Sequence, residues 1–206
     1  MENKIKNYLS DKYVLAGIFF LILQIIITYY LINEGRMTVL IWFCNHSPLL
    51  FSLAFFLKNK GMVKGLINFG LLIQIIWVID FFNVTVTGNS LFGLTNYIFE
   101  SENFASFFAP IVVHMFGVIV AFLFTFKEKP SKKDLVYSGV YILIIYFVTL
   151  FFTRPELNIN CVQKFCAEEL TFKYYNFLWP ILSFAIIVLL TQGIRYLIWK
   201  NVQKNK

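Results

Sequence analysis

The sequence predicts an all-α, polytopic membrane helical bundle with six transmembrane helices. Of its 206 residues, 59% are hydrophobic and 14% are charged, and the mean hydropathy is +0.70. Soluble domains have roughly 45–50% apolar and about 25% charged residues. Apolar runs of about 20 residues, enough for a helix to cross a bilayer core of roughly 30 Å, recur along the chain. A soluble enzyme, a disordered tail and a DNA-binding module are therefore excluded.

Six apolar runs define the expected spans, and residues 1–206 are expected to form a single membrane domain. The first run, 14–32, is longer than the roughly 7–15 apolar residues of a signal peptide and ends without a small-residue cleavage site, so we interpret it as a true span. The remaining runs are 38–57, 64–83, 105–126, 135–153 and 175–199. The second, fourth and sixth runs each contain one proline (Pro48, Pro110 and Pro180), which removes a backbone hydrogen bond and kinks a helix.

The distribution of basic residues predicts the orientation. Fourteen of the 18 Lys and Arg residues, with Lys64 and Arg195 among them, flank the spans on the side that holds both termini. Short cytoplasmic loops of membrane proteins carry an excess of Lys and Arg. We therefore expect cytoplasmic N- and C-termini in a multi-pass protein of the cell (plasma or inner) membrane. The net charge of +7 is then a consequence of topology, and no nucleic-acid partner is expected.

Two long outer loops, 84–104 and 154–174, contain apolar and aromatic residues and are expected to cap the outer face. The second loop contains Cys161 and Cys166, which can form a disulfide outside the cytoplasm if the loop bends back, or remain two free thiols. Two thiols without a nearby His are too few ligands for a zinc site. On the cytoplasmic side, Gly61 and Gly65 match a GxxxG spacing, which we interpret as a flexible turn rather than a dimer face.

Polar residues of three spans fall in the outer half of the predicted bundle. They are Cys44 and Asn45 in the second span, Asp80 in the third and His114 in the fourth. Ionisable groups inside spans are costly and are functional candidates by default. The three span prolines lie in the same outer halves, and irregular backbone at membrane depth is tolerated where it lines a cavity. The sequence therefore predicts an outward-facing polar cavity among the second, third, fourth and sixth spans.

Each polar residue has a catalytic and a structural interpretation. Cys44 can act as the nucleophile of acyl transfer, or it is a small buried apolar residue. His114 can act as its general base, or it makes an interhelical hydrogen bond. Asp80 or Asn45 can orient the imidazole or stabilise the oxyanion, and Asp80 can equally be a structural acid near the interface. His46 is two residues from Cys44 and points to another helix face, so it is the less suitable partner.

In the order of these residues along the chain, the sequence resembles the YwaF-like six-span bacterial membrane proteins. The animal relatives of that family include a cysteine-dependent phospholipid acyltransferase. The resemblance extends over about residues 41–190 and implies six spans and acyl chemistry. Its blocks are Cys44-Asn45, Asp80, His114, residues 158–166 and Trp179-Pro180. The chain departs from that family at Trp42, where a His is common, and at Met115, where a Gly is common. It is also similar to six-span proteins with a WFCN motif, present here at 42–45.

The leading hypothesis is a six-helix enzyme that transfers or hydrolyses lipid acyl chains, with Cys44 as nucleophile and His114 as base. This chemistry requires neither a metal nor a cofactor, and its partners are membrane lipids. Two alternatives remain. A small-solute transporter or binding protein would use the same cavity as its site, and a non-catalytic membrane assembly partner would not need it.

Overall fold

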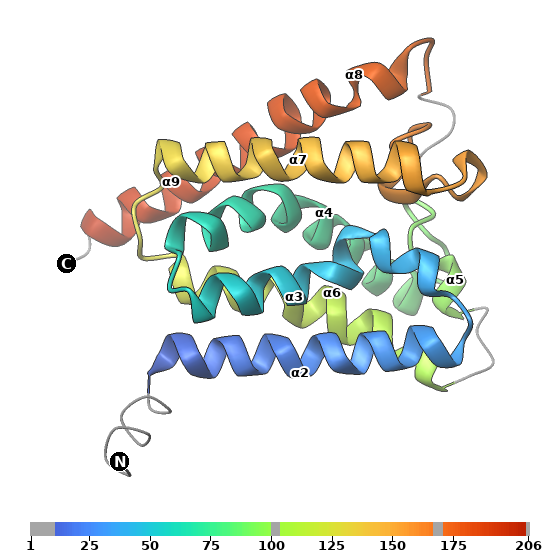
Figure 1. Ribbon diagram of the computed structural model, residues 1–206, viewed down its shortest axis with the longest axis horizontal. Helices are drawn as coiled ribbons and strands as arrows, with labels where there is room; N and C mark the ends of the chain where they lie inside the picture. Colours follow the sequence, from blue (N-terminus) through green and yellow to red (C-terminus); the bar gives the residue numbers. More distant parts are fainter. Residues whose placement is uncertain (1–10, 100–103, 167–170, 205–206) are drawn as a thin grey trace.

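The computed structural model describes residues 11–99, 104–166 and 171–204, and over these ranges the chain is helical with no strand (Figure 1). Five helices are long and apolar enough to cross a membrane. They are α2 (Lys12–Asn33), α4 (Lys60–Thr87), α6 (Phe104–Thr125), α7 (Lys132–Phe152) and the continuous run Tyr175–Lys204. That run joins α8 (Tyr175–Leu182), the π-helical segment η5 (Ser183–Val188) and α9 (Leu189–Lys204). The prediction of an all-helical fold is confirmed over the described residues, and five of the six expected spans correspond to helices long and apolar enough to cross a membrane.

The second expected span, 38–57, is not one continuous helix. It begins with a short 3₁₀ helix, η1 (Met37–Ile41), and continues as α3 (Phe43–Phe56), a 14-residue helix. The two are separated at Trp42, which has an extended ψ of 136°. At about 1.5 Å per residue, α3 is roughly 21 Å long, which is shorter than the roughly 30 Å of a bilayer core.

The helices alternate in direction along the bundle. Figure 1 shows α2, α4 and α7 running one way and α3, α6 and the α8–α9 run returning, so that α2 begins and α9 ends at the same end of the molecule. Helix α4 lies in the middle, contacts α3, α6, α7 and α9, and is the most buried of the five long helices. The opposite end carries η1, the short helix α5 (Asn96–Phe99), η2 (Pro155–Leu157) and η3 (Ile159–Cys161).

The GxxxG pair does not form a flexible turn, as the sequence interpretation held. Gly61 and Gly65 belong to the first two turns of α4, and both pack against α7. A Cβ atom on Gly65 would lie 2.6 Å from Cβ of Tyr137 and 2.9 Å from the Asp134 carbonyl oxygen. The absence of side chains therefore allows α4 and α7 to approach closely.

Apolar residues form two clusters. The larger lies between α2, α3, α4, α6 and α7 and includes the fully buried rings of Phe20, Phe51 and Phe55. The smaller, made of Trp77, Phe81 and Ile98, joins the end of α4 to α5. Helix α4 runs four residues beyond its expected end at 83 and stops at Gly88, whose φ of 74° is the left-handed conformation that glycine adopts readily. The outer loop consequently starts at that glycine.

Candidate functional site

The residues predicted for nucleophile and oxyanion stabilisation lie together in the first turn of α3. Cys44 is a half-buried free thiol, and its Sγ lies 3.7 Å from Oδ1 of Asn45. Asn45 also donates from Nδ2 to the Val39 carbonyl at 2.8 Å, which ties α3 to η1. The thiol is therefore placed at a helix N-terminus, with an amide oxygen as its neighbour.

A residue of the second outer loop holds this helix start in place. Oδ1 of Asn160 accepts a hydrogen bond from the Phe43 N–H at 2.8 Å, and Nδ2 of Asn160 donates to the Ile41 carbonyl at 3.0 Å. One amide thus spans the break at Trp42. The next residue, Cys161, forms a disulfide with Cys166, and its carbonyl accepts from the Tyr175 hydroxyl at 3.0 Å. The loop is therefore anchored at both η1–α3 and α8.

Asp80 organises the other outer loop. Its carboxylate is fully buried and accepts hydrogen bonds from the Leu91, Phe92 and Leu94 N–H groups at 2.8–2.9 Å. The hydroxyls of Ser90 and Thr95 donate to it at 2.8 and 2.9 Å. Five donors from one loop therefore surround the two oxygens. This arrangement matches the structural interpretation of Asp80, because little acceptor capacity is left for an imidazole.

His114 lies against an aromatic ring rather than an acid. Its imidazole stacks on the indole of Trp77, with the ring centroids 4.0 Å apart and the planes at 6°. Trp77 stacks in turn on Phe81, one turn further along α4. Nδ1 of His114 is buried and has no hydrogen-bond partner in the described part of the chain. His114 therefore adjoins the smaller apolar cluster through Trp77.

Cys44 and Asn45 are neighbours in the sequence and lie together at the start of α3, whereas neither His114 nor Asp80 makes a hydrogen bond to them in the described part of the chain. Among the described residues, no hydrogen bond or ring contact joins His114 to Cys44 or to Asp80. Burial raises the pKa of the Tyr97 phenol on α5, although nearly half of the residue is exposed. In the same described ranges, no group of three His, Cys, Asp or Glu side chains is arranged to hold a metal ion.

An apolar groove lies on the other side of α3. It has a volume of about 540 Å³ and is lined by side chains from η1, α3, α4 and α7. Val140 and Ile144 of α7 line it and are half exposed, so the groove opens on the outer surface of the bundle. Its volume lies within the range of roughly 300–1,000 Å³ that is typical of ligand sites.

One polar pair interrupts the apolar wall of the groove. Nε2 of His46 lies 2.6 Å from the Tyr141 hydroxyl, and Nδ1 of His46 lies 3.2 Å from the Leu40 carbonyl. A carbonyl oxygen only accepts, so Nδ1 carries the proton and Nε2 of the neutral ring accepts from Tyr141. Sequence reasoning set His46 aside because it considered only its relation to Cys44. Its partner is 95 residues away on α7, and no local spacing indicates that pairing.

The described chain is all-helical, its long apolar helices indicate a membrane protein, and an apolar groove opens on its surface. Comparisons of the chain with family models, with curated proteins and with solved structures gave no match. Membership of the YwaF-like family therefore stays a prediction.

Proposed function

We propose that this protein is a multi-pass membrane protein that binds a lipid acyl chain in the groove between α3 and α7. The observation that carries the proposal is the groove itself. It has a volume of about 540 Å³ and an almost wholly apolar lining, in which the His46–Tyr141 pair is the polar contact. Apolar pockets with a small number of placed polar groups are typical of small-molecule sites, where the polar groups fix the orientation of the ligand.

The proposed topology has six crossings, with α3 and η1 together forming the second. Both ends of the described chain then face the cytoplasm. Support comes from the basic residues at the end where α2 begins, including Lys58, Lys60, Lys127 and Lys204, because cytoplasmic loops carry most of the Lys and Arg in membrane proteins. In this orientation the η1 end of the groove lies towards the outer leaflet.

The polar pair favours a lipid whose head group donates a hydrogen bond. The Tyr141 hydroxyl already donates its one proton to His46, so towards a ligand its oxygen can only accept. Lipid tails in the bilayer are as apolar as the groove wall, and transfer of a chain from one to the other gains little hydrophobic free energy. Selectivity must therefore come from shape and from this hydrogen bond. A monoacylglycerol, with one chain and free hydroxyls, satisfies both requirements.

The test is photo-crosslinking with a monoacylglycerol that carries a diazirine in its chain, on the full-length protein in lipid nanodiscs. We expect labelled peptides from α3 and α7, and several-fold less labelling in Ile144→Trp, because the indole fills the groove. The matched control is Ile181→Trp, an exposed apolar position on α8 that does not line the groove. Equal labelling of every lipid-facing helix, or unchanged labelling in Ile144→Trp, would overturn the proposal.

Acyl transfer by Cys44 is a second candidate, favoured by two observations. Cys44 is a free thiol at a helix N-terminus beside the Asn45 amide, and Nδ1 of the buried His114 has no partner in the described chain. Turnover of a lipid ester that is lost in both Cys44→Ser and His114→Ala would support this chemistry, and turnover that persists in either variant would exclude it. Groove labelling in Cys44→Ser separates the two candidates, since binding does not require the thiol.

A further inference from the structure

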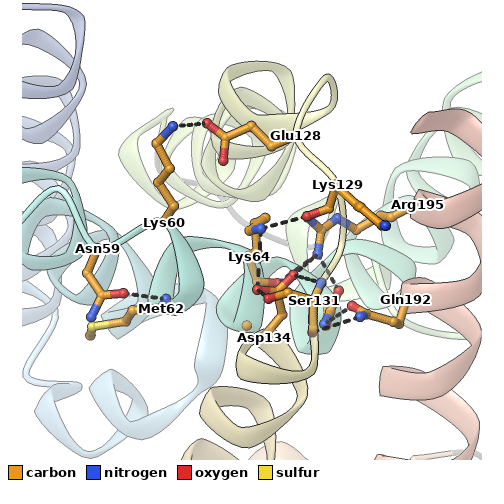
Figure 2. A network of polar contacts seen from close by, with 12 residues as sticks. Asn59, Lys60, Met62, Lys64, Glu128, Lys129, Ser131, Asp134, Gln192 and Arg195 are labelled. Atoms are coloured by element: carbon orange, nitrogen blue, oxygen red, sulfur yellow. Dashed lines mark hydrogen bonds and ion pairs between the residues drawn. The ribbon is translucent and has the colours of Figure 1, made fainter. Parts of the chain in front are cut away.

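A buried ionic cluster lies at the end of the bundle opposite the outer loops (Figure 2). It contains Lys64 of α4, Asp134 of α7 and Arg195 of α9, with side chains that are 8%, 0% and 2% exposed. Lys64 Nζ lies 3.4 Å from Asp134 Oδ1, and Arg195 Nη1 lies 3.8 Å from Asp134 Oδ2. Three helices distant in the sequence therefore bring three charges together out of solvent.

Neutral groups complete the network around the guanidinium. Nη1 of Arg195 donates to Asn68 Oδ1 at 2.6 Å and to the Lys64 carbonyl at 3.2 Å. Asn68 Nδ2 donates to Gln192 Oε1 at 2.7 Å, and Gln192 donates to the Ser131 carbonyl at 3.1 Å. Among the described residues, the hydrogen bonds and the ion pair of Arg195 therefore all use the single nitrogen Nη1.

The cluster has one positive charge more than its carboxylate can balance. Asp134 faces both cations, and its oxygens also accept from the Ser131 hydroxyl and N–H as part of the cap of α7. Glu128, the acid that precedes Asp134 in the sequence, pairs with Lys60 at 2.8 Å and attracts Arg195 less strongly than Asp134 does. A buried charge without a counter-ion is strongly destabilising, so an excess positive charge at this depth favours an anion.

The unused part of Arg195 has the shape that binds oxyanions. Nε and Nη2 are buried and have no hydrogen-bond partner among the described residues. These two nitrogens carry the N–H groups of one edge of the planar guanidinium, which point in parallel and match two oxygens of one phosphate or carboxylate. One edge thus has no hydrogen-bond partner among the described residues, while Nη1 on the other side holds the helices together.

We propose that this edge of Arg195 binds a phosphate group at the membrane interface. Phosphate is favoured over carboxylate by the position of the site, because α9 continues to an aromatic pair, Tyr196 and Trp199, of the kind that lies at lipid head-group depth. Lys129 adds a further positive charge over the Trp199 ring. Basic pockets between helices on this side of a membrane bind phospholipid head groups.

Entry of the phosphate requires a local movement. The connection between α6 and α7 lies against the cluster, because Lys64 Nζ donates to the Lys129 carbonyl at 2.9 Å and Gln192 donates to that of Ser131. Nε and Nη2 are shielded from solvent. The proposal therefore includes a movement of this connection that admits the phosphate, with charge-assisted hydrogen bonds from Arg195 to the phosphate as its compensation.

Two wild-type measurements test the site and identify the source of the phosphate. Native mass spectrometry of the full-length protein compares retention of phosphatidic acid with that of diacylglycerol, which lacks the phosphate. Thermal unfolding with inorganic phosphate, against chloride at equal ionic strength, tests the free ion. Preferential retention of phosphatidic acid assigns a lipid head group, and a higher Tm in phosphate assigns the free anion. Neither effect in the folded protein overturns the proposal.

Variants then test whether Arg195 is the residue that binds the phosphate. Arg195→Lys keeps the charge but loses the parallel edge, and Asn68→Asp supplies a carboxylate that neutralises the excess charge. Each is expected to weaken phosphate binding about tenfold, and the second keeps the shape of the side chain it replaces. Lys200→Gln, which removes an exposed charge from the same helix, is the control and should bind normally. Wild-type affinity in the folded Asn68→Asp variant, or an equal loss in the control, overturns the assignment.

Discussion

The side-chain amide of Gln24 in α2 bridges the backbone of α3 beside Pro48. Its Oε1 accepts from the Leu49 N–H at 3.0 Å, and its Nε2 donates to the Asn45 carbonyl at 3.1 Å. These two backbone groups are the pair that an unbroken α-helix would join to each other. A residue of the neighbouring helix thus supports α3 at the point where proline perturbs it.

Replacing Gln24 with Met should lower the stability of the protein by about 1–3 kcal/mol, because it leaves the Leu49 N–H and the Asn45 carbonyl without that partner while keeping the side-chain length. Thermal unfolding of the purified protein in detergent measures the effect. Ile22→Met is the matched control, since this exposed position on the same helix should change stability little. Equal stability of the two variants would show that the bridge contributes nothing.

Asn160→Asp should destabilise the start of α3. The new carboxylate still accepts from Phe43 but presents a second oxygen to the Ile41 carbonyl, so one hydrogen bond becomes a repulsive contact, at a cost of about 1–3 kcal/mol. Asp tolerates the positive φ of 53° at this position almost as well as Asn does. Chemical denaturation measures this loss of stability, with Asn201→Asp as a control at an exposed position. Equal unfolding midpoints for the two variants would contradict the role of Asn160.

Asp80→Asn should release the loop 88–95 from α4. An amide offers one acceptor oxygen to five donors and turns its own N–H groups towards them. Hydrogen exchange at Leu91, Phe92 and Leu94 is expected to accelerate by about tenfold or more, which corresponds to roughly 1.4 kcal/mol per tenfold. Ser90→Ala, which removes only one donor, should give a smaller acceleration. Unchanged protection in Asp80→Asn would refute the structural role of this carboxylate.

Gly65→Ala should separate α4 from α7 and cost about 1–3 kcal/mol, since the new methyl group meets the Tyr137 side chain and the Asp134 carbonyl below ordinary contact distance. Gly193→Ala is the control within a helix, because a Cβ there meets no atom within 4 Å. The control should gain about 0.5–1 kcal/mol from the higher helix propensity of Ala. A stabilised Gly65→Ala would contradict the close packing of α4 on α7.

The long helices could be predicted because each contains an apolar run of sufficient length in its own sequence. Length and hydropathy located the five long helices, and the asymmetry of charge grouped Lys64 and Arg195 with the basic end of the bundle. The break at Trp42 was not predictable, because Asn160 stabilises it from the other end of the chain. The sequence also counted Lys64 and Arg195 among the charges that flank the spans, whereas both are buried against Asp134.

The sequence by itself determined an all-helical chain with membrane-spanning helices, because apolar composition and run length act residue by residue. Only the tertiary structure decided what the polar residues contact. In the structure, the Asp80 carboxylate binds the loop that follows α4, His114 stacks on Trp77, and His46 and Tyr141 lie together in the groove. Such pairings depend on the rotation and depth of one helix against another, which side-chain packing sets and hydropathy does not encode.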